Sequence, residues 1–396
     1  MKRLLFIAAI LVLFAAEILR VYFIMPFPGS QRSDSINFAY FLHNYIFYIR
    51  IVCLLIILIV LFQLYPQWRR GQKIFFFSAM LLYAAIFYLV NFKFLADKMF
   101  YQPRHKNFAT SSTNKIPGSD LVIGVALNGE AKAFPIEIIG YHHQVQDTIG
   151  GHPVMVTYCS VCRTGRVYEP FVNGKKESFR LVGMDHFNAM FEDKTTKSWW
   201  YQATGEAIAG PLKNKTLAEI PSQQMTLSGW LRQYPNSFIL QPDPDFIKQY
   251  KDLKGFNTGT IDSKLEKRDS GSWNLKSWVV GIKYNNKEKA YDWNDLIREK
   301  VINDSLGGRP ILLFVEPDSI SFHAFSRIVD DQVLQFTLDS TGKYFSDVTS
   351  ASTWNFDGKA IAGPLRDKKL KSIPAHQEFW HSWKTFHPGT SIYKTD

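Results

Sequence analysis

Three long apolar stretches at the start of the chain constrain its fold more than any other feature. They cover about residues 4–24, 45–65 and 74–95. Each approaches the ~20 residues that a helix needs to cross a bilayer core. A cleaved signal peptide is the alternative for the first stretch, but that stretch is long and lacks a clear small-residue cleavage site. We therefore predict about three transmembrane helices within residues 1–104, with the lipid bilayer as their partner.

Charge divides the chain in the same way and gives an orientation. Residues 1–104 contain 11 Lys+Arg and 3 Asp+Glu, which leaves 35 and 32 for the remainder. The basic excess therefore lies at helix ends, and no basic stripe indicates nucleic-acid binding. Lys2, Arg3, Arg69 and Arg70 place the N terminus and the second interhelical loop in the cytoplasm by the positive-inside rule. We expect an inner-membrane protein whose soluble part lies outside, in the periplasm or extracellular space. Within the first stretch, we interpret Glu17 and Arg20 as a pair or as side chains that reach the interface.

The soluble part contains an internal repeat. Ala207–Leu212 recurs as Ala360–Leu365 at an offset of 153, and Gly150–Pro153 corresponds to Gly307–Pro310 at an offset of 157. Repetition at a fixed spacing indicates duplicated structural units. We predict a linker at 105–120, a first unit at 121–240, a spacer at 241–277 and a degenerate second unit at 278–396.

Each unit is predicted to be mainly β with a few short helices, an α+β class. Short runs that alternate apolar and polar residues, such as 153–158, are typical of strands. Asn128-Gly129 is typical of a hairpin turn. Gly150-Gly151 predicts a turn with positive φ, which we expect Asp147 to cap or close.

Residues that occur in one unit only are candidates for a specialised site. The first unit contains His142, His143, Cys159 and Cys162. At the 157 offset the second unit replaces them with Glu299, Lys300, Glu316 and Ser319. We therefore place the functional centre in the first unit.

The first unit resembles a bacterial family called domain of unknown function 3179. The resemblance rests on Asp147–Val154, Tyr158–Cys162, Thr196–Gln202 and Gly205–Gly210, which occur in order over roughly residues 120–240. The family usually has Tyr-Cys-Pro-Leu-Cys, whereas this chain has Ser160 and Val161 between its cysteines. Both sulfurs are kept. The resemblance implies a domain, and it implies little about its chemistry.

Four interpretations of the cysteine pair compete. Attachment of c-type haem requires His directly after the second Cys, and Arg163 stands there instead. A thioredoxin-like dithiol normally lies at a helix N terminus, whereas β-like segments flank this pair, although Arg163 and Arg166 could stabilise a thiolate. A structural disulfide is the third interpretation. The fourth is a metal site in which two thiolates and one or two His bind Zn or Cu.

Metal binding is the leading hypothesis from the sequence. Cys159, Cys162 and His143 are the predicted ligands of copper or zinc, and His142, His152 and His186 are weaker candidates. A thiol–disulfide oxidoreductase and a non-catalytic assembly module are the alternatives. Asp185 with His186 could act as an acid–base pair. No nucleotide-binding motif occurs, and no motif assigns a substrate, a catalytic residue or a protein partner.

Overall fold

The computed structural model describes residues 1–395 and divides into two compact units. The membrane unit comprises Met1–Tyr101, Glu177–Tyr201 and Glu206–Thr216. The β unit comprises Gln102–Lys176, Gln202–Gly205 and the chain from Leu217 onward. A helical N-terminal region is thus followed by many small β-sheets, as the sequence predicted in outline.

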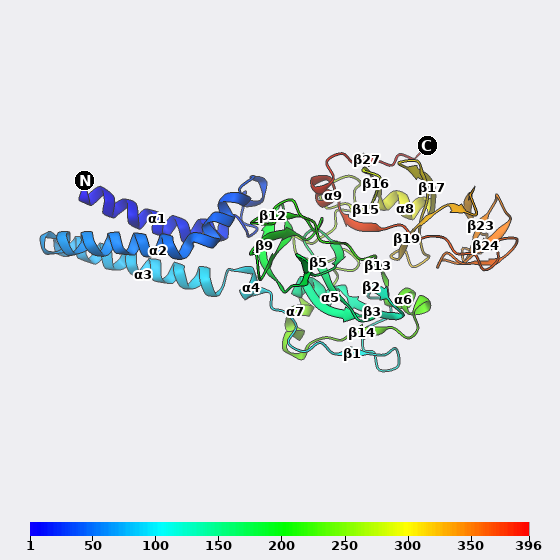
Figure 1. Cartoon of the computed structure of the whole chain (residues 1–396), viewed down its shortest axis with the longest axis horizontal. Helices are drawn as coiled ribbons and strands as arrows, with labels where there is room; N and C mark the ends of the chain where they lie inside the picture. Colours follow the sequence, from blue (N-terminus) through cyan, green and yellow to red (C-terminus); the bar gives the residue numbers. More distant parts are fainter. Residues whose placement is uncertain (396) are drawn as a thin grey trace. The chain divides into compact units, whose positions relative to one another are not determined.

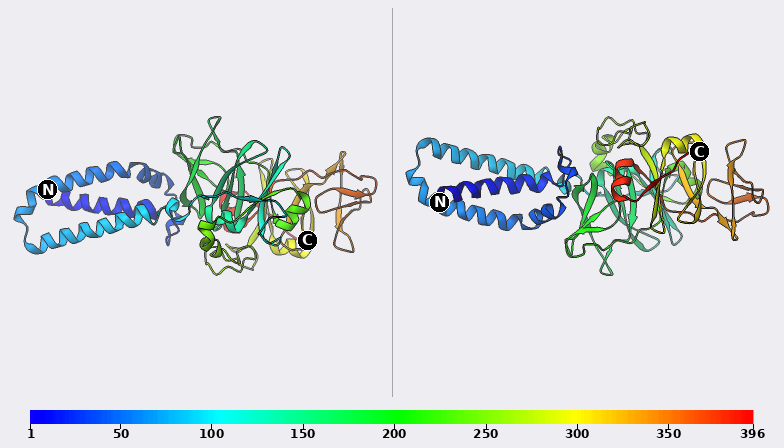
Figure 2. Two further views of the ribbon diagram at one scale, coloured as in Figure 1. Left: turned by 90° about the horizontal axis from the view of Figure 1, so that it is seen from below. Right: turned by 90° about the horizontal axis from the view of Figure 1, so that it is seen from above.

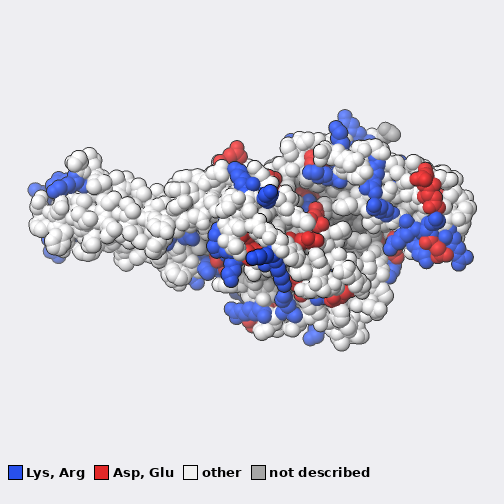
Figure 3. Space-filling view, viewed as in Figure 1, with Lys and Arg blue, Asp and Glu red and all other residues white. Residues whose placement is uncertain are grey.

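Three helices of the membrane unit are long and apolar enough to cross a bilayer. They are α1 (Lys2–Tyr22), α2 (Ile36–Leu64) and α3 (Arg70–Phe92), and they lie side by side (Figures 1 and 2). The N terminus and the α2–α3 connection share one end of this bundle. That end carries Lys and Arg, while the visible face of the helices is almost uncharged (Figure 3).

The second helix begins nine residues before the expected apolar stretch. Hydropathy detects the apolar segment that can cross a membrane, and it misses the first turns of the helix because they carry polar side chains. One of these polar residues is Asn44, whose Nδ2 donates to the Tyr40 carbonyl within the helix at 2.9 Å. The other two helices start two and four residues before the predicted positions.

A polar cluster joins the three helices. Glu17 is fully buried and accepts two hydrogen bonds from Arg50, at 2.5 and 2.8 Å, and one from the Tyr83 hydroxyl at 3.1 Å. Arg20 donates to Asn91 Oδ1 at 2.7 Å. The counter-charge of Glu17 is therefore Arg50 on α2, and Arg20 bonds to α3 instead. A buried ion pair is how a charged side chain is tolerated at membrane depth.

The membrane unit also holds a small antiparallel sheet. Its strands are β9 (Phe179–Asp185), β10 (Asn188–Asp193), β11 (Trp199–Tyr201) and β12 (Ala207–Ala209), in the order β12-β11-β10-β9. Trp199 and Trp200 are buried, and their indole N–H groups donate to Glu192 and Asp193, each at 3.0 Å. Met184 on β9 donates its N–H to the Ile24 carbonyl, which attaches the sheet to the α1 end. This part of residues 121–240 therefore belongs to the membrane unit.

The first half of the β unit begins with a hairpin. Its elements are β2 (Leu121–Leu127), β3 (Glu130–Pro135), α5 (Ile136–His142), β4 (Gln144–Ile149), β5 (His152–Cys159) and β6 (Thr164–Tyr168). Asn128 and Gly129 have φ of 49° and 84°, as the predicted β2–β3 turn requires. β1 (Phe108–Ala109) pairs with β14 (Phe238–Leu240), so the segment predicted as a linker contains a strand of a five-stranded sheet.

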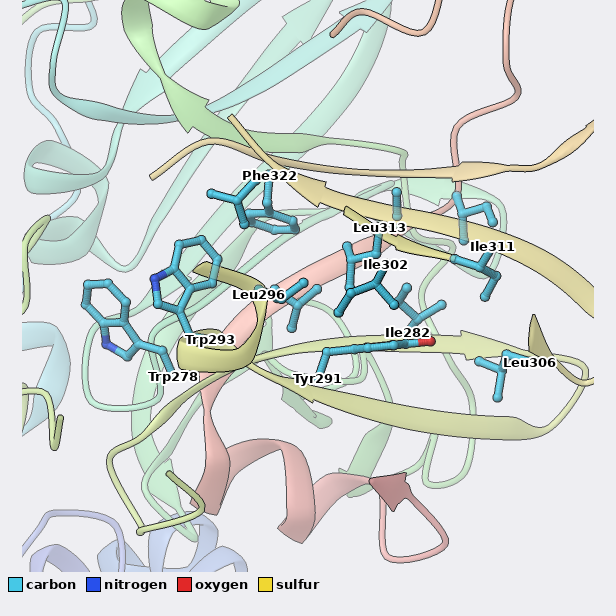
Figure 4. Packing of buried hydrophobic residues seen from close by; sticks show 14 of the residues in the cluster. Trp278, Ile282, Tyr291, Trp293, Leu296, Ile302, Leu306, Ile311, Leu313 and Phe322 are labelled. Atoms are coloured by element: carbon cyan, nitrogen blue, oxygen red, sulfur yellow. The ribbon is translucent and has the colours of Figure 1, made fainter. Parts of the chain in front are cut away.

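The same succession of elements occurs in the second half. These are β15 (Trp278–Tyr284), β16 (Lys287–Asp292), α8 (Trp293–Glu299), β17 (Val301–Leu306), β18 (Arg309–Val315) and β19 (Phe322–Ser326). Their apolar faces enclose a core that includes Tyr291, Trp293 and Phe322 (Figure 4).

Asp147 does not close the Gly150-Gly151 turn as expected. It lies within β4 and accepts from Lys132 Nζ at 2.9 Å, while the turn glycines have φ of 54° and 76°. The second half has the same ion pair between Lys289 and Asp304, at 2.8 Å. Lys132 on β3 therefore holds the carboxylate, and the two glycines supply the positive φ of the turn.

A strand and a helix close each half. β13 (Gln223–Thr226) pairs with β2 and leads into α6 (Leu227–Gln233), while β26 (Ala375–Phe379) pairs with β15 and leads into α9 (Trp380–Phe386). The Trp230 ring lies on Gly124 so closely that a Cβ there would be 2.2 Å from it. Trp383 and Gly281 repeat this contact at 2.2 Å. The backbone can approach the rings only because these residues are glycine.

The closing strand of each half also contacts the hairpin of the other half. Phe379 donates its N–H to the Cys162 carbonyl at 2.9 Å, and Thr226 donates its N–H to Ser321 Oγ at 3.0 Å. Between the two strands, Gln224 Nε2 donates to Gln377 Oε1 at 2.9 Å. The contacts are reciprocal, so neither half has a complete environment without the other.

Short elements complete the chain. In chain order they are η1 (Ser30–Arg32), η2 (Tyr65–Gln67), α4 (Ala96–Met99), β7 (Phe171–Val172), β8 (Lys175–Lys176), η3 (Pro244–Phe246), α7 (Ile247–Lys251), β20 (Ile328–Val329), β21 (Gln332–Val333), β22 (Phe336–Leu338), β23 (Phe345–Asp347), β24 (Ser352–Trp354), β25 (Ala360–Ala362) and β27 (Ser391–Ile392).

Candidate functional site

The two cysteines lie on the β5–β6 hairpin. Cys159 ends β5 and pairs with Thr164, and Cys162 belongs to the connecting residues 160–163, which we call the cysteine turn. Arg163 closes the turn with φ of 55°, and its N–H donates to the Ser160 carbonyl at 3.2 Å. Both cysteines are buried, and they are 1 % and 0 % exposed. The turn therefore holds two sulfurs within a closed environment.

A long irregular loop packs on the cysteine turn. Residues 252–277, which we call the cover loop, contain no helix or strand between α7 and β15. Lys276 Nζ donates to the Val161 carbonyl at 2.8 Å, and Ser160 Oγ donates to Glu266 Oε1 at 3.3 Å. The Arg163 guanidinium donates to the Phe256 and Asn257 carbonyls at 3.0 and 3.2 Å. Loops of this length without secondary structure are commonly functional.

Lys276 is the cation that acts on both sulfurs. Burial lowers the pKa of its ammonium, while the Cys162 and Cys159 thiolates oppose that shift. Such interactions are mutual, because an ammonium also stabilises a thiolate beside it. His381 Nε2 lies 3.3 Å from Lys276 Nζ. Burial, with the Lys276 charge, lowers the His381 pKa to about 4, so this imidazole is neutral at pH 7.

The arginines near the cysteines have other partners. Arg163 donates Nε to Gln377 Oε1 at 2.9 Å, and its guanidinium lies 3.7 Å from the Trp278 ring centroid. Arg166 forms a buried ion pair with Glu378, to which Ser382 Oγ also donates at 2.8 Å. Lys276 is therefore a better candidate than either arginine for the expected stabilisation of a thiolate.

His143 lies beside the strand that carries Cys159. Its backbone is left-handed with φ of 59°, and Nδ1 is 3.0 Å from the Tyr158 carbonyl oxygen. Burial lowers the His143 pKa to about 4, so the ring is neutral at pH 7. A neutral ring that donates Nδ1–H to a carbonyl has its lone pair on Nε2, as metal-binding histidines commonly do.

One group of three possible metal-ligating side chains lies elsewhere in the β unit. Within residues 1–395, ligand atoms of three such residues lie within 4.8 Å of one another only at His105, Asp243 and Asp245. Asp243 Oδ2 there accepts the backbone N–H groups of Arg104 and His105, which explains its position structurally. Cys159, Cys162 and His143 are not part of that group.

The other predicted histidines have structural partners. His142 Nε2 lies 2.7 Å from the Tyr250 hydroxyl in an aromatic cluster. His152 lies 3.2 Å from Glu169 at the surface of the β unit. In the membrane unit, His186 Nδ1 lies 2.9 Å from Asp185, and this hydrogen bond raises the His186 pKa. Asp185 also accepts from the Tyr201 hydroxyl.

A different network occupies the corresponding corner of the second half. Glu316, at the position of Cys159, accepts from His323 Nε2 at 2.7 Å and from both Arg232 Nη atoms at 3.0 and 2.7 Å. Burial alone would raise the Glu316 pKa, but these hydrogen bonds outweigh it and lower the pKa to about 2. The corner is therefore closed by charge pairing and carries no sulfur.

Three residues around the cysteine turn escaped the sequence prediction. Glu378 and His381 correspond to Met225 and Ser228 at the 153 offset, so comparing the two units over that segment could have found them. Lys276 lies in the predicted spacer, where no repeat signal exists.

Comparison with known proteins places the chain in a family. No curated protein and no solved structure matches it. A family profile matches residues 101–390, so the match extends over both halves rather than residues 120–240 alone. The chain belongs to the family described as Protein of unknown function (DUF3179).

Proposed function

We propose that this chain is a membrane-anchored thiol–disulfide exchange protein whose reactive group is the Cys159–Cys162 pair. The observation that carries the proposal is Lys276, a half-buried ammonium that bonds to the cysteine turn and interacts with both sulfurs. The thiolate is the nucleophile in disulfide exchange, and a nearby cation increases its population.

The exchange balances in two steps. One cysteine thiolate attacks a substrate disulfide, forming a mixed disulfide and releasing one substrate sulfur as a thiolate. The second cysteine, as its thiolate, attacks the mixed disulfide, forms the Cys159–Cys162 bond and releases the other substrate sulfur. Two electrons pass from the cysteine pair to the substrate disulfide, and the two protons lost by the cysteines balance those taken up by the released thiolates.

We infer that the two halves are tandem copies and that the β unit lies outside the cytoplasm. The repeated order of elements, the two glycine–tryptophan contacts and the two lysine–aspartate pairs support the duplication. Lys2, Arg3, Arg69 and Arg70 support a cytoplasmic N terminus, and three crossings then lead outside. Disulfide chemistry suits that oxidising side.

Metal binding by the same cysteines is the second candidate. The hydrogen bond that orients His143 supports it, because it leaves the lone pair on Nε2. Zinc sites use four ligands, whereas soft sulfur ligands select Cu(I). Two thiolates with Lys276 as counter-charge therefore suit copper better than zinc.

One preparation tests both candidates. The full-length protein, purified without oxygen in lipid nanodiscs, is analysed for bound metal and titrated against thiol–disulfide buffers. Exchange predicts a midpoint potential above about −300 mV, where inert structural bridges lie. It also predicts that Lys276→Gln raises the pKa for thiol alkylation, while Lys175→Gln, on the exposed strand β8, has no effect. A midpoint potential below that value contradicts exchange, and so does an alkylation pKa that is the same in Lys276→Gln as in the unaltered protein. Stoichiometric metal that disappears in the Cys159→Ser/Cys162→Ser variant supports the metal site instead.

A further inference from the structure

We propose that a basic groove on the cover loop binds the substrate and that this substrate is a disulfide flanked by carboxylates. This inference rests on the proposed exchange activity and names its substrate class. The groove has a volume of about 720 Å³, and eight residues between Lys264 and Lys276 line it. It contains four cationic side chains and one carboxylate: Lys264, Lys267, Arg268, Lys276 and Asp269.

The groove charge is available to a ligand. Lys264 and Lys267 are exposed, and Asp269 Oδ1 already accepts the Gly271 N–H at 2.9 Å. Arg268 already donates Nη2 to Asn294 Oδ1 at 2.7 Å, and its guanidinium lies 4.3 Å from the Trp278 ring centroid. The exposed ammonium groups of Lys264 and Lys267 are therefore the charges that an anionic ligand meets, and charge-assisted hydrogen bonds are the strong ones.

Lys276 connects the groove to the thiols. The same side chain that lines the groove donates to the Val161 carbonyl on the cysteine turn and to the Leu265 carbonyl at 2.5 Å. A carboxylate in the groove competes for this ammonium, because a charged acceptor binds it more strongly than a neutral carbonyl does.

Binding of an anion would therefore loosen the cover over the sulfurs. The cysteines are at most 1 % exposed, so a substrate disulfide reaches them only when the cover loop moves. Residues 262–276 of this loop contain no helix or strand and no buried residue, which lowers the cost of local opening there. Binding of the substrate carboxylate to the groove thus both attracts the substrate and gives it access to the sulfurs.

Matched model disulfides test the charge preference. The reduced full-length protein in uncharged nanodiscs is oxidised at low ionic strength by dithiodiglycolate, bis(2-hydroxyethyl) disulfide or cystamine, which are anionic, neutral and cationic. We expect the anion to react at least about tenfold faster than the cation, with a difference that shrinks at high salt.

Charge reversal identifies the groove as the cause. Lys264→Glu/Lys267→Glu should abolish or invert the preference, whereas Lys175→Glu/Lys176→Glu, an equal change on the exposed strand β8, should leave it unchanged. All four lysines are exposed, so folding is retained, and thermal unfolding verifies this. Oxidised glutathione and a disulfide-bridged acidic peptide separate a small-molecule from a polypeptide substrate.

The outcomes separate the two proposals. Equal rates for the three disulfides, or a preference that survives the groove reversal, overturn the substrate class and leave exchange intact. Absence of reaction with every disulfide, or reaction that persists in Cys159→Ser/Cys162→Ser, overturns the exchange activity itself.

Discussion

The ion pair between Arg166 and Glu378 should be among the most sensitive polar contacts of the β unit. The two side chains are 3 % and 1 % exposed, and they join the β6 hairpin to β26. Removal of one partner from a buried pair typically costs ~3–5 kcal/mol, because the other charge stays buried without compensation. Glu219 lies 3.6 Å from Arg166 Nε and is 39 % exposed, so it offsets part of the loss. We therefore expect Glu378→Gln to destabilise the protein by about 3 kcal/mol.

Urea unfolding of the full-length protein in nanodiscs measures this cost. Tryptophan fluorescence and circular dichroism must give coincident transitions, and the midpoint should fall by roughly 1 M for an m value of about 3 kcal/mol/M. Loss of the exposed pair Lys368–Asp330 by Asp330→Asn, with side chains 50 % and 57 % exposed, should cost about 1 kcal/mol or less.

A double variant separates the pair from its surroundings. Arg166→Met/Glu378→Met removes both charges. Its cost in unfolding free energy should be smaller than the sum of the costs of Arg166→Met and Glu378→Met by at least about 2 kcal/mol. A cost below 1 kcal/mol for Glu378→Gln, or additive single and double effects, would refute the reasoning.

Three further predictions concern other parts of the chain. Gly281→Ala should cost about 2 kcal/mol or more, since its Cβ would meet the buried Trp383 ring, whereas Gly71→Ala, with no atom within 4 Å, should be tolerated; thermal unfolding compares them. Burial lowers the His143 pKa from 6.5 to about 4, so the unfolded chain takes up a proton at a higher pH than the folded chain does. The stability that the neutral ring contributes is therefore complete above pH 6.5 and is lost as the pH falls towards 4. His143→Asn, which suits φ of 59°, should flatten unfolding midpoints measured across that window. Glu17→Gln should lower thermal stability in nanodiscs by leaving its arginine partner without a counter-charge, and Glu17→Gln/Arg50→Met should restore part of it.

Local patterns predicted the membrane helices and many of the β elements. Hydropathy located three helices, and the Asn128-Gly129 hairpin formed as expected because its turn chemistry depends on neighbouring residues only. The strand β1 was missed because its two residues pair with β14, more than a hundred residues away. Asp147 was misplaced because its partner Lys132 lies on another strand. The periodicity of apolar residues predicts local structure only and does not indicate which distant segments pair.

The candidate site was predicted only in part for the same reason. Comparison of the two units singled out Cys159 and Cys162, which the structure places on one buried turn. Lys276, more than a hundred residues later, approaches them only through tertiary packing. His143 lies beside Tyr158, whose carbonyl oxygen is 3.0 Å from its Nδ1, and its role as a metal ligand stays a prediction.

The reciprocal contacts between the closing strands and the opposite hairpins bear on the ancestry of the chain. Under the proposed duplication, a single-copy ancestor could complete its corners only as a twofold-symmetric pair of identical subunits. Such a pair would carry two cysteine turns. Covalent fusion allows the two corners to diverge, and Glu316 with His323 and Arg232 now occupies one of them. A relative with one copy should therefore be a homodimer with two equivalent cysteine turns, whereas this chain carries one such turn.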